Sequence, residues 1–215
     1  MRLILRIGGS VVASPFNPGL LQKYAELLKG LSREGHESAV VVGGGALARE
    51  FIRIAKDLGL PESVQDDVAI SVSRLHARLF VEMLGETGCG KVLVTIKEAS
   101  HCFGRKRVAV MGGLRPGMTT DTVAALIAEK VNADLYIKAT DQDGVYDKDP
   151  LKFPEAVKYP QISYLEVLSQ GLGVMDASAV AMCRDNHLPI IVFNLNTTGN
   201  IMRMAMGEAV GTVIK

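Results

Sequence analysis

The chain has 215 residues, of which 48% are hydrophobic and 22% charged, and its 24 basic and 23 acidic residues leave a net charge of +1. This composition is that of a globular protein and excludes disordered and collagen-like chains. Because there is no basic stripe, we expect no binding to a nucleic-acid polymer. No stretch reaches the roughly 18 consecutive apolar residues of a membrane span, so we expect no contact with a membrane.

Short apolar runs alternate along the chain with longer segments of helical period. Helical stripes are indicated at residues 47–58, 68–83 and 123–131 and, more weakly, at 180–187. The order strand, helix, strand with uniformly apolar strands indicates a mainly parallel sheet that helices cover on both faces. The runs predicted to be strands are residues 3–7, 39–42, 92–95, 108–111, 135–137, 190–193 and 212–214.

The pattern therefore predicts an α/β fold, built as a three-layer sandwich around a mainly parallel central sheet. Residues 1–215 are predicted to form a single domain. The longest polar interruption, at residues 141–154, is the plausible joint between two lobes of that domain. In such sheets, ligands bind beyond the carboxyl ends of the strands.

Two glycine-rich loops follow the first two predicted strands. Backbone N–H groups of Gly8-Gly9-Ser10 and the serine hydroxyl could bind an anion, although the segment also fits a plain tight turn. Three glycines at 43–45 lead directly into a predicted helix, whose N-terminus favours phosphate. They form neither a dinucleotide motif nor a P-loop. Arg49, one turn into that helix, either binds the same anion or is solvated.

Two further loops follow later strands. Residues 111–121 again join a strand to a helix through glycines, with Asp121 suited to the first helical turn. The flexible stretches around Arg115 favour a polar substrate. Residues 138–150 begin with a lysine at the end of an apolar strand and continue through an Asp-Gly turn. They fit the phosphate, ribose and base of a nucleotide, or else a hairpin with a snorkelling lysine.

The basic side chains at two strand ends, Arg6 and Lys138, combine with the glycine loops into a site suited to a polyanionic transition state. The chain has no Ser-His-Asp order and no metal-binding motif, so no metal held by the protein alone is predicted. The four histidines are expected to be solvated rather than ligands: His36, His76, His101 and His187.

The three cysteines are scattered along the chain, at Cys89, Cys102 and Cys183. This spacing forms neither a disulfide framework nor a metal knuckle. It predicts reduced thiols and a cytoplasmic protein.

In their order and spacing, the four loops resemble the amino acid kinase family and, within it, the branch that phosphorylates UMP. The resemblance covers essentially the whole chain. The motifs that carry it are I-G-G-S at 7–10, V-V-G-G-G-x-L-A-R at 41–49, M-G-G-x-x-P-G-x-T-T-D at 111–121, K-A-T-x-x-D-G-V-Y-x-x-D-P at 138–150, V-M-D-A-S-A-V-A at 174–181, L-P-I-I-V-F-N-L-N at 188–196 and M-G-E-x-x-G-T at 206–212.

The resemblance implies an amino acid kinase-like sandwich without a P-loop. It implies transfer of the γ-phosphoryl group from Mg²⁺-ATP to UMP, giving UDP and ADP for pyrimidine nucleotide synthesis, with Mg²⁺ carried by ATP. Residues 1–133 would form the acceptor lobe and residues 134–215 the ATP lobe. The family resemblance also implies a homo-oligomer, expected to be a hexamer.

Residue roles follow from the same resemblance. Lys138, Asp121 and Arg6 would be catalytic. ATP would contact Gly9, Ser10, Gly45, Arg49, Thr140, Tyr146 and Asp149. UMP would contact Gly44, Asp66, Leu114, Arg115, Pro116, Gly117, Met118, Thr119 and Thr120.

One position departs from the family pattern, because bacterial relatives have lysine where this chain has Arg6. The planar guanidinium supplies the charge on a longer fork, so its placement need not be identical. Two alternative functions stay open. One is a kinase of the same fold acting on a carbamoyl, acyl or isopentenyl phosphate acceptor, and the other is a nucleotide-binding relative without turnover.

Overall fold

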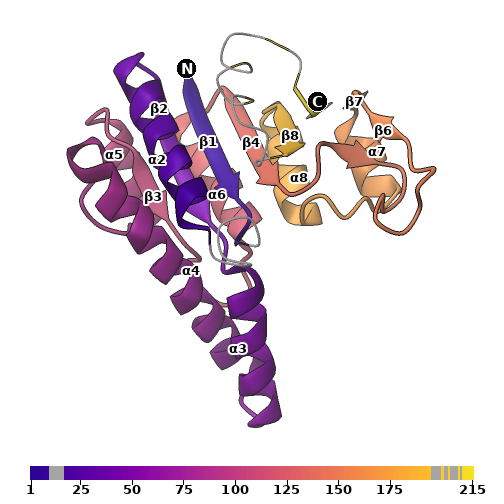
Figure 1. Cartoon of the computed structure of the whole chain (residues 1–215), viewed down its shortest axis with the longest axis horizontal. Coiled ribbons are helices and arrows are strands. Elements are labelled where there is room, and N and C mark those ends of the chain that lie inside the picture. Colours follow the sequence, from indigo (N-terminus) through magenta and orange to yellow (C-terminus); the bar gives the residue numbers. More distant parts are fainter. Residues whose placement is uncertain (10–16, 195–199, 201–202, 204–207, 209) are drawn as a thin grey trace.

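The computed structural model describes residues 1–9, 17–194, 200, 203, 208 and 210–215. Within this part of the chain, seven strands form one sheet in the order β3-β2-β1-β4-β8-β9-β7 (Figure 1). Its neighbours are parallel except for the antiparallel pair β8 and β9, which confirms the predicted fold class. The strands are β1 (Arg2–Ile7), β2 (Glu37–Val42), β3 (Ala109–Met111), β4 (Leu135–Thr140), β7 (Gln161–Ile162), β8 (Ile190–Asn194) and β9 (Thr212–Ile214).

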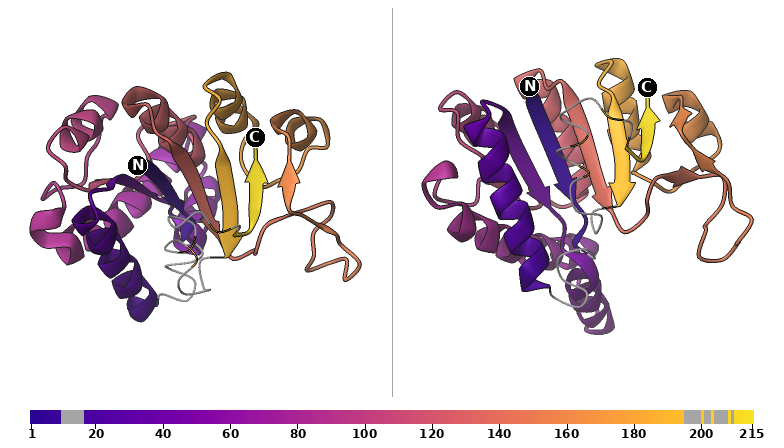
Figure 2. Two further views of the ribbon diagram at one scale, coloured as in Figure 1. Left: turned by 90° about the horizontal axis from the view of Figure 1, so that it is seen from above. Right: turned by 45° about the horizontal axis from the view of Figure 1, so that its top comes forward.

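Helices cover both faces of this sheet and make it the middle of three layers (Figures 1 and 2). Successive β1 residues point to opposite faces, so Leu5 packs in the cluster that includes α2 and α4 and Ile4 in the cluster that includes α5, α6 and α8. The helices are α2 (Pro18–Arg33), α3 (Gly45–Asp57), α4 (Glu62–Leu84), the 3₁₀ turn η1 (Gly85–Thr87), α5 (Ile96–Phe103), α6 (Thr120–Val131), α7 (Tyr164–Ser169) and α8 (Ala177–Asp185).

The apolar run at residues 92–95 is not a strand. Leu93 makes one isolated parallel bridge, to Met111, and its neighbours leave the sheet. The Thr95 side chain instead caps α5 by accepting a hydrogen bond from the Glu98 N–H at 3.1 Å. This capping competes with strand pairing, which explains why the prediction from the apolar run was wrong.

The predicted stripe of α3 faces away from the core, and that of α4 does so only in part, because Val72 is buried. On α3 the buried positions are Ala48 and Ala55, while Phe51 is 43% exposed. On α4 the core receives Phe80, whereas Leu75 is 58% exposed. The stripe at 123–131 of α6 is buried as expected. Apolar periodicity identifies an apolar helix face, but it does not identify what covers that face.

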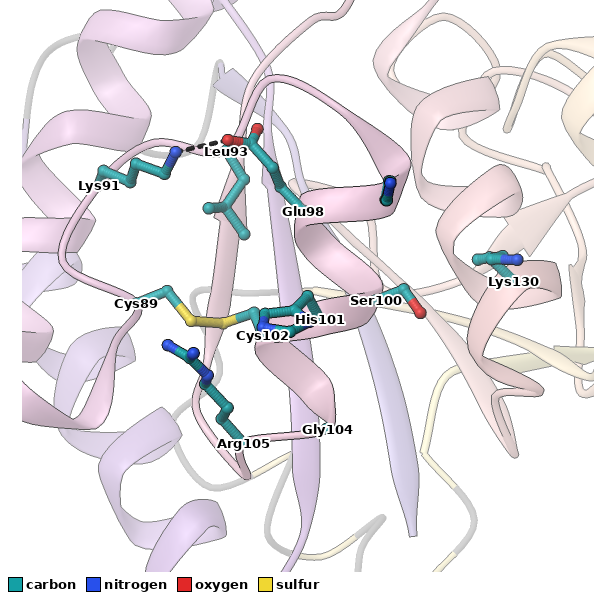
Figure 3. A pocket seen from close by; sticks show the side chains of 11 residues that line it. Cys89, Lys91, Leu93, Glu98, Ser100, His101, Cys102, Gly104, Arg105 and Lys130 are labelled. Atoms are coloured by element: carbon teal, nitrogen blue, oxygen red, sulfur yellow. Dashed lines mark hydrogen bonds and ion pairs between the residues drawn. A yellow bond between two sulfur atoms is a disulfide. The ribbon is translucent and has the colours of Figure 1, made fainter.

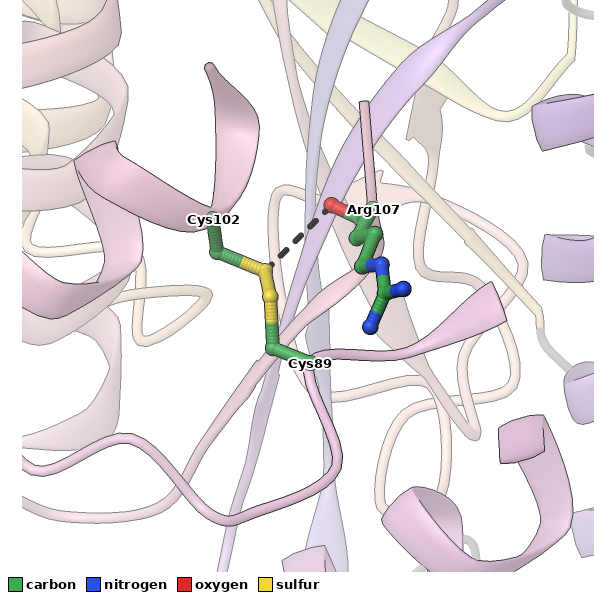
Figure 4. Close-up of a disulfide and its surroundings, with 3 residues drawn as sticks. All are labelled: Cys89, Cys102 and Arg107. Carbon is green, nitrogen blue, oxygen red and sulfur yellow. Dashed lines mark hydrogen bonds between the residues drawn. A yellow bond between two sulfur atoms is a disulfide. The ribbon is translucent and has the colours of Figure 1, made fainter. Parts of the chain in front are cut away.

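Cys89 and Cys102 form a disulfide, with their Cα atoms 6.2 Å apart (Figure 4). The expectation of three reduced thiols is therefore wrong, because the fold brings the loop after η1 against α5. Cys183 is free and buried. The disulfide lines a cavity of about 640 Å³ that also receives Lys91, whose ammonium pairs with Glu98 (Figure 3).

The polar joint at residues 141–154 contributes to an arm at the edge of the molecule. Within it, β5 (Val145–Tyr146) pairs with the antiparallel strand β6 (Lys158–Tyr159) in a separate two-stranded sheet (Figure 2). The Thr212 hydroxyl of β9 accepts a hydrogen bond from the Val145 N–H at 2.8 Å and so ties the arm to the main sheet. Among the described helices, none has the length and apolarity needed to cross a membrane.

Candidate functional site

The first two glycine loops meet at the carboxyl ends of β1 and β2. The Gly43 N–H donates to the Ile7 carbonyl at 3.0 Å, which continues the strand pairing into the loops. A Cβ atom at Gly9 would lie 2.1 Å from the backbone nitrogen of Gly45. Only glycine allows this approach of backbone to backbone. The structure thus joins two predicted anion loops, while the predicted contact Ser10 lies outside the described residues.

A buried ion pair joins the ends of β4 and α6. The Lys138 Nζ lies 2.5 and 2.6 Å from the two carboxylate oxygens of Asp121, and the side chains are 7% and 10% exposed. Asp121 occupies the first turn of α6, where the Thr119 side chain is the N-cap. The Tyr136 hydroxyl donates to the same carboxylate at 3.3 Å. Two residues far apart in the sequence are thereby held in one geometry.

Arg6 extends this cluster from β1, because the strand register places it beside Lys138. Its Nε lies 2.9 Å from Asp121 Oδ1 and forms an ion pair with it, but within the described part of the chain the Nε–H makes no hydrogen bond. Its Nη2 donates to the Thr120 hydroxyl at 3.0 Å. The arginine therefore contributes charge to the cluster and keeps a buried Nε–H donor that makes no hydrogen bond with a described residue. Such a donor is available to an incoming anion.

The surroundings of Lys138 destabilise its charged form, but the ammonium still predominates at neutral pH. Burial, and then the charge of Arg6, lower the pKa of Lys138 from 10.5 to about 8, although the Asp121 carboxylate acts in the opposite direction. Two cations share one carboxylate, so the site has unmatched positive charge at neutral pH. A polyanionic ligand would relieve that imbalance.

A cavity of about 590 Å³ opens beside this cluster, between the glycine loops and α4. Arg49 also lines it, although the resemblance placed this side chain at ATP. Leu114 packs against the core instead, and Pro116 is exposed outside the lining. The cavity brings together most of the residues predicted to contact the acceptor: Gly44, Asp66, Arg115, Gly117, Met118, Thr119 and Thr120.

Asp66 lies in the second turn of α4 rather than at its start, because the helix begins at Glu62. Its Oδ2 accepts a hydrogen bond from the Gly117 N–H at 2.7 Å. The carboxylate is thus fixed against the third loop and still lines the cavity, whereas Asp67 is more exposed and does not.

A second cavity, of about 520 Å³, lies at the other side of the β4 end. It is lined by the predicted contacts Thr140, Tyr146 and Asp149. The Tyr146 hydroxyl donates to Asp143 Oδ1 at 2.5 Å, and this bond fixes the orientation of the tyrosine ring. Sequence reasoning missed the segment after α7 that closes this cavity, because it carries no polar motif: Gln170, Gly171, Leu172, Gly173 and Val174.

Asp176 is a second residue whose role the sequence did not reveal. It caps α8 by accepting from the Ala179 N–H at 2.9 Å, and it also accepts from the Thr119 and Thr122 hydroxyls. Burial raises the pKa of Asp176, but hydrogen bonds from Ser178 and Thr119 outweigh it and hold the pKa below its usual range. Among the described residues, no group of three or more His, Cys, Asp or Glu side chains can hold a metal ion.

His76 is buried, contrary to the expectation that the histidines are solvated. It lies on the inner face of α4, and its Nδ1 is 3.1 Å from the carbonyl oxygen of Gly43. The stripe predicted for this helix had placed it on a polar face.

A sequence model of the amino acid kinase family matches residues 1–194, and the chain belongs to that family.

Proteins of the same length are similar to it throughout. A uridylate kinase of Methanothermobacter thermautotrophicus is 39% identical, with 100% of this chain and 99% of the relative covered. The crystal structure of uridylate kinase from Archaeoglobus fulgidus superimposes with a TM-score of 0.91 at 37% identity, and both chains are covered completely. A UMP kinase structure from Bacillus anthracis gives a TM-score of 0.88 at 25% identity, over 100% of this chain and 95% of that one.

Proposed function

We propose that this protein is a UMP kinase, which transfers the γ-phosphoryl group of ATP to UMP in pyrimidine nucleotide synthesis. The observation that carries the proposal is the buried Arg6–Lys138–Asp121 cluster between two cavities. Arg6 lines one cavity, and Thr140, two residues beyond Lys138, lines the other. Full-length similarity to uridylate kinases supports UMP as the acceptor.

The two cavities suit two nucleotides. UMP would occupy the cavity of Asp66 and the third glycine loop, and the adenosine of ATP would occupy that of Tyr146 and Asp149. The ATP phosphates would then extend along Gly9 and Gly45, whose backbones approach too closely for any side chain. This arrangement aligns donor and acceptor across the charged cluster.

Transfer of a phosphoryl group needs position and charge rather than a covalent intermediate. The ammonium of Lys138 and the guanidinium of Arg6 would neutralise the charge on the transferring group. The Asp121 carboxylate holds both cations in place. Mg²⁺ usually binds through substrate phosphates with one or two carboxylates at most. Lys138 already contacts both oxygens of Asp121, so Mg²⁺ would be held mainly by the phosphates of ATP. When bound, Mg²⁺ would neutralise the phosphates.

A panel of acceptors tests this function against the other kinase chemistries of the fold. ADP release from ATP is measured with UMP, CMP, dTMP, carbamate and isopentenyl phosphate. We expect kcat/KM for UMP to exceed that for CMP by at least about tenfold, because a mismatched base leaves buried polar groups unpaired. Equal values for UMP and CMP, or a preference for a non-nucleotide acceptor, would refute the proposal. Nucleotide binding without ADP release would instead indicate a non-catalytic relative.

The protein is further proposed to be a homo-oligomer, with a hexamer expected from the family resemblance. Exposed apolar side chains along α3 and α4 support the proposal, among them Phe51, Leu58 and Leu75. Monomeric soluble proteins rarely expose so many large apolar side chains close together. Light scattering should give a multiple of the 23.1 kDa chain mass. Phe51→Glu should lower that mass, and a wild-type monomer would contradict the proposal.

A further inference from the structure

One turn of α4 contacts two of the glycine-rich loops through polar side chains. Ser73 Oγ accepts a hydrogen bond from the Gly113 N–H at 2.8 Å and donates to the Ile70 carbonyl at 2.7 Å. Arg74 donates from Nε to the Gly113 carbonyl at 3.0 Å and from Nη2 to the Leu114 carbonyl at 2.9 Å. These bonds satisfy three backbone groups of the third loop, namely the N–H and carbonyl of Gly113 and the carbonyl of Leu114.

His76 makes the corresponding contact with the second loop. Its Nδ1 lies 3.1 Å from the Gly43 carbonyl oxygen. Because a carbonyl only accepts, the ring must carry its proton on Nδ1 to make this bond. Ser73, Arg74 and His76 lie within four consecutive residues, so one rigid helical turn contacts both loops.

The glycines of the third loop are required by this contact. A Cβ atom on Gly112 would lie 2.7 Å from Ser73 Oγ and 2.8 Å from the backbone nitrogen of Arg74. One on Gly113 would lie 2.9 Å from Ile70 Cγ1. The loop therefore lies directly on the helix, and the side chains of α4 replace the water that its backbone would otherwise bind.

Both loops line the acceptor cavity a few residues further on. The second contributes Gly44 and Gly45, and the third contributes Gly113, Arg115 and Gly117. The distance between the second and third loops therefore sets the width of the cavity. The turn of α4 that carries Ser73, Arg74 and His76 contacts both loops.

We propose that Ser73, Arg74 and His76 are positioning residues, which hold the two glycine loops at the separation that the acceptor nucleotide requires. This inference rests on the proposed UMP kinase function. Arg74 and His76 do not line the acceptor cavity and act through the loops, whereas Ser73 holds Gly113 and also lines the cavity. Loss of Ser73 or Arg74, which contact the third loop, should therefore weaken acceptor binding far more than ATP binding, because the second cavity makes no contact with this turn.

Arg74→Met tests the proposal, with Arg78→Met as the matched control. Arg78 lies one turn further along the same helix, is exposed and pairs with Glu82. We expect Arg74→Met to raise KM for UMP at least about tenfold while KM for ATP changes less than about threefold. Arg78→Met should leave both unchanged. Equal changes in the two KM values would mean that Arg74 acts only on general stability.

His76 provides a second, conservative comparison. In His76→Asn the amide Nδ2–H can replace the Nδ1–H and donate to Gly43, whereas in His76→Leu no donor remains. The asparagine variant should retain KM for UMP within about threefold of wild type, and the leucine variant should raise it at least about tenfold. If the two variants bind UMP equally well, the hydrogen bond to Gly43 does not position the loop.

Hydrogen exchange without nucleotides separates this inference from the proposed function. Peptides covering residues 112–118 should exchange faster in Arg74→Met than in wild type and in Arg78→Met, because two loop carbonyls lose their partner. Faster exchange together with no UMP phosphorylation by the wild type would refute the function and leave the positioning intact. Normal exchange in Arg74→Met, with an active wild type, would overturn the positioning.

Discussion

At the scale of single residues, Lys138 has the least ordinary environment in the candidate site. Its ammonium is buried, bonded to Asp121 and flanked by the guanidinium of Arg6. Lys138→Met removes the charge and keeps much of the side-chain volume. We expect kcat to fall at least about 100-fold with little change in either KM, because the charge acts mainly in the transition state. Steady-state kinetics measures this, and a near-normal kcat would reduce Lys138 to a structural residue.

The same lysine predicts a pH dependence. Its pKa is lowered to about 8, so the free enzyme loses the ammonium charge as the pH rises through 8. The charged form is the one that neutralises phosphate, and kcat/KM should therefore decline above pH 8. Bound phosphates favour the charged form, so kcat should decline at a higher pH. A kcat/KM that stays constant to pH 9.5 would contradict the assignment of Lys138.

Asp66 belongs to the same scale, and its neighbour Asp67 is the internal control. In the proposed complex, the Asp66 carboxylate accepts hydrogen bonds from ribose hydroxyls while it holds the Gly117 N–H. Asp66→Asn loses the charge that strengthens these bonds. KM for UMP should rise at least about tenfold and KM for ATP should stay within about threefold. If Asp67→Asn gives the UMP defect instead, the ribose contact belongs to the neighbouring residue.

At the scale of elements, the disulfide ties the loop after η1 to α5. Thiol titration of the unfolded protein without reductant should find one reactive cysteine, Cys183, and three after reduction. Cys89→Ser should lower stability by up to about 3 kcal/mol, since closing a loop of this length restricts the unfolded chain. Calorimetry would detect the lower Tm. Three free thiols before reduction would restore the sequence-based expectation of reduced cysteines.

The elements also separate what the sequence predicts from what it cannot. Strand ends followed by glycines predicted that Lys138 and Gly43 would meet at one edge of the sheet, because parallel strands share that edge. The inward face of α4 was not predictable from the sequence. Ser73 and His76 are polar, and they are buried only because the glycine loops pack against them. For Phe51 the failure is different. Its apolar stripe is real, but none of the described elements covers it.

At the scale of the whole molecule, the two cavities proposed for donor and acceptor lie at the ends of different strands. The acceptor cavity forms around the loops after β2 and β3, and the second cavity forms after β4 and beside the β5–β6 arm. The strand order brings these two sets together at β1 and β4, the neighbouring strands that carry Arg6 and Lys138. Topology, rather than local motif, therefore creates the charged junction between them.

The contact of Gly9 with Gly45 bears on how this protein could be redesigned. In a saturation library, even alanine at residue 9 would collide with the neighbouring backbone, so that position should return glycine alone. Substitutions at Gly9 should consequently not be recovered in such a library. Arg115 is exposed at the rim of the acceptor cavity and has no such constraint. Directed evolution toward a larger or differently charged acceptor therefore has its accessible route through the rim of the third loop, whereas the phosphate end of the site should remain unchanged across selected variants.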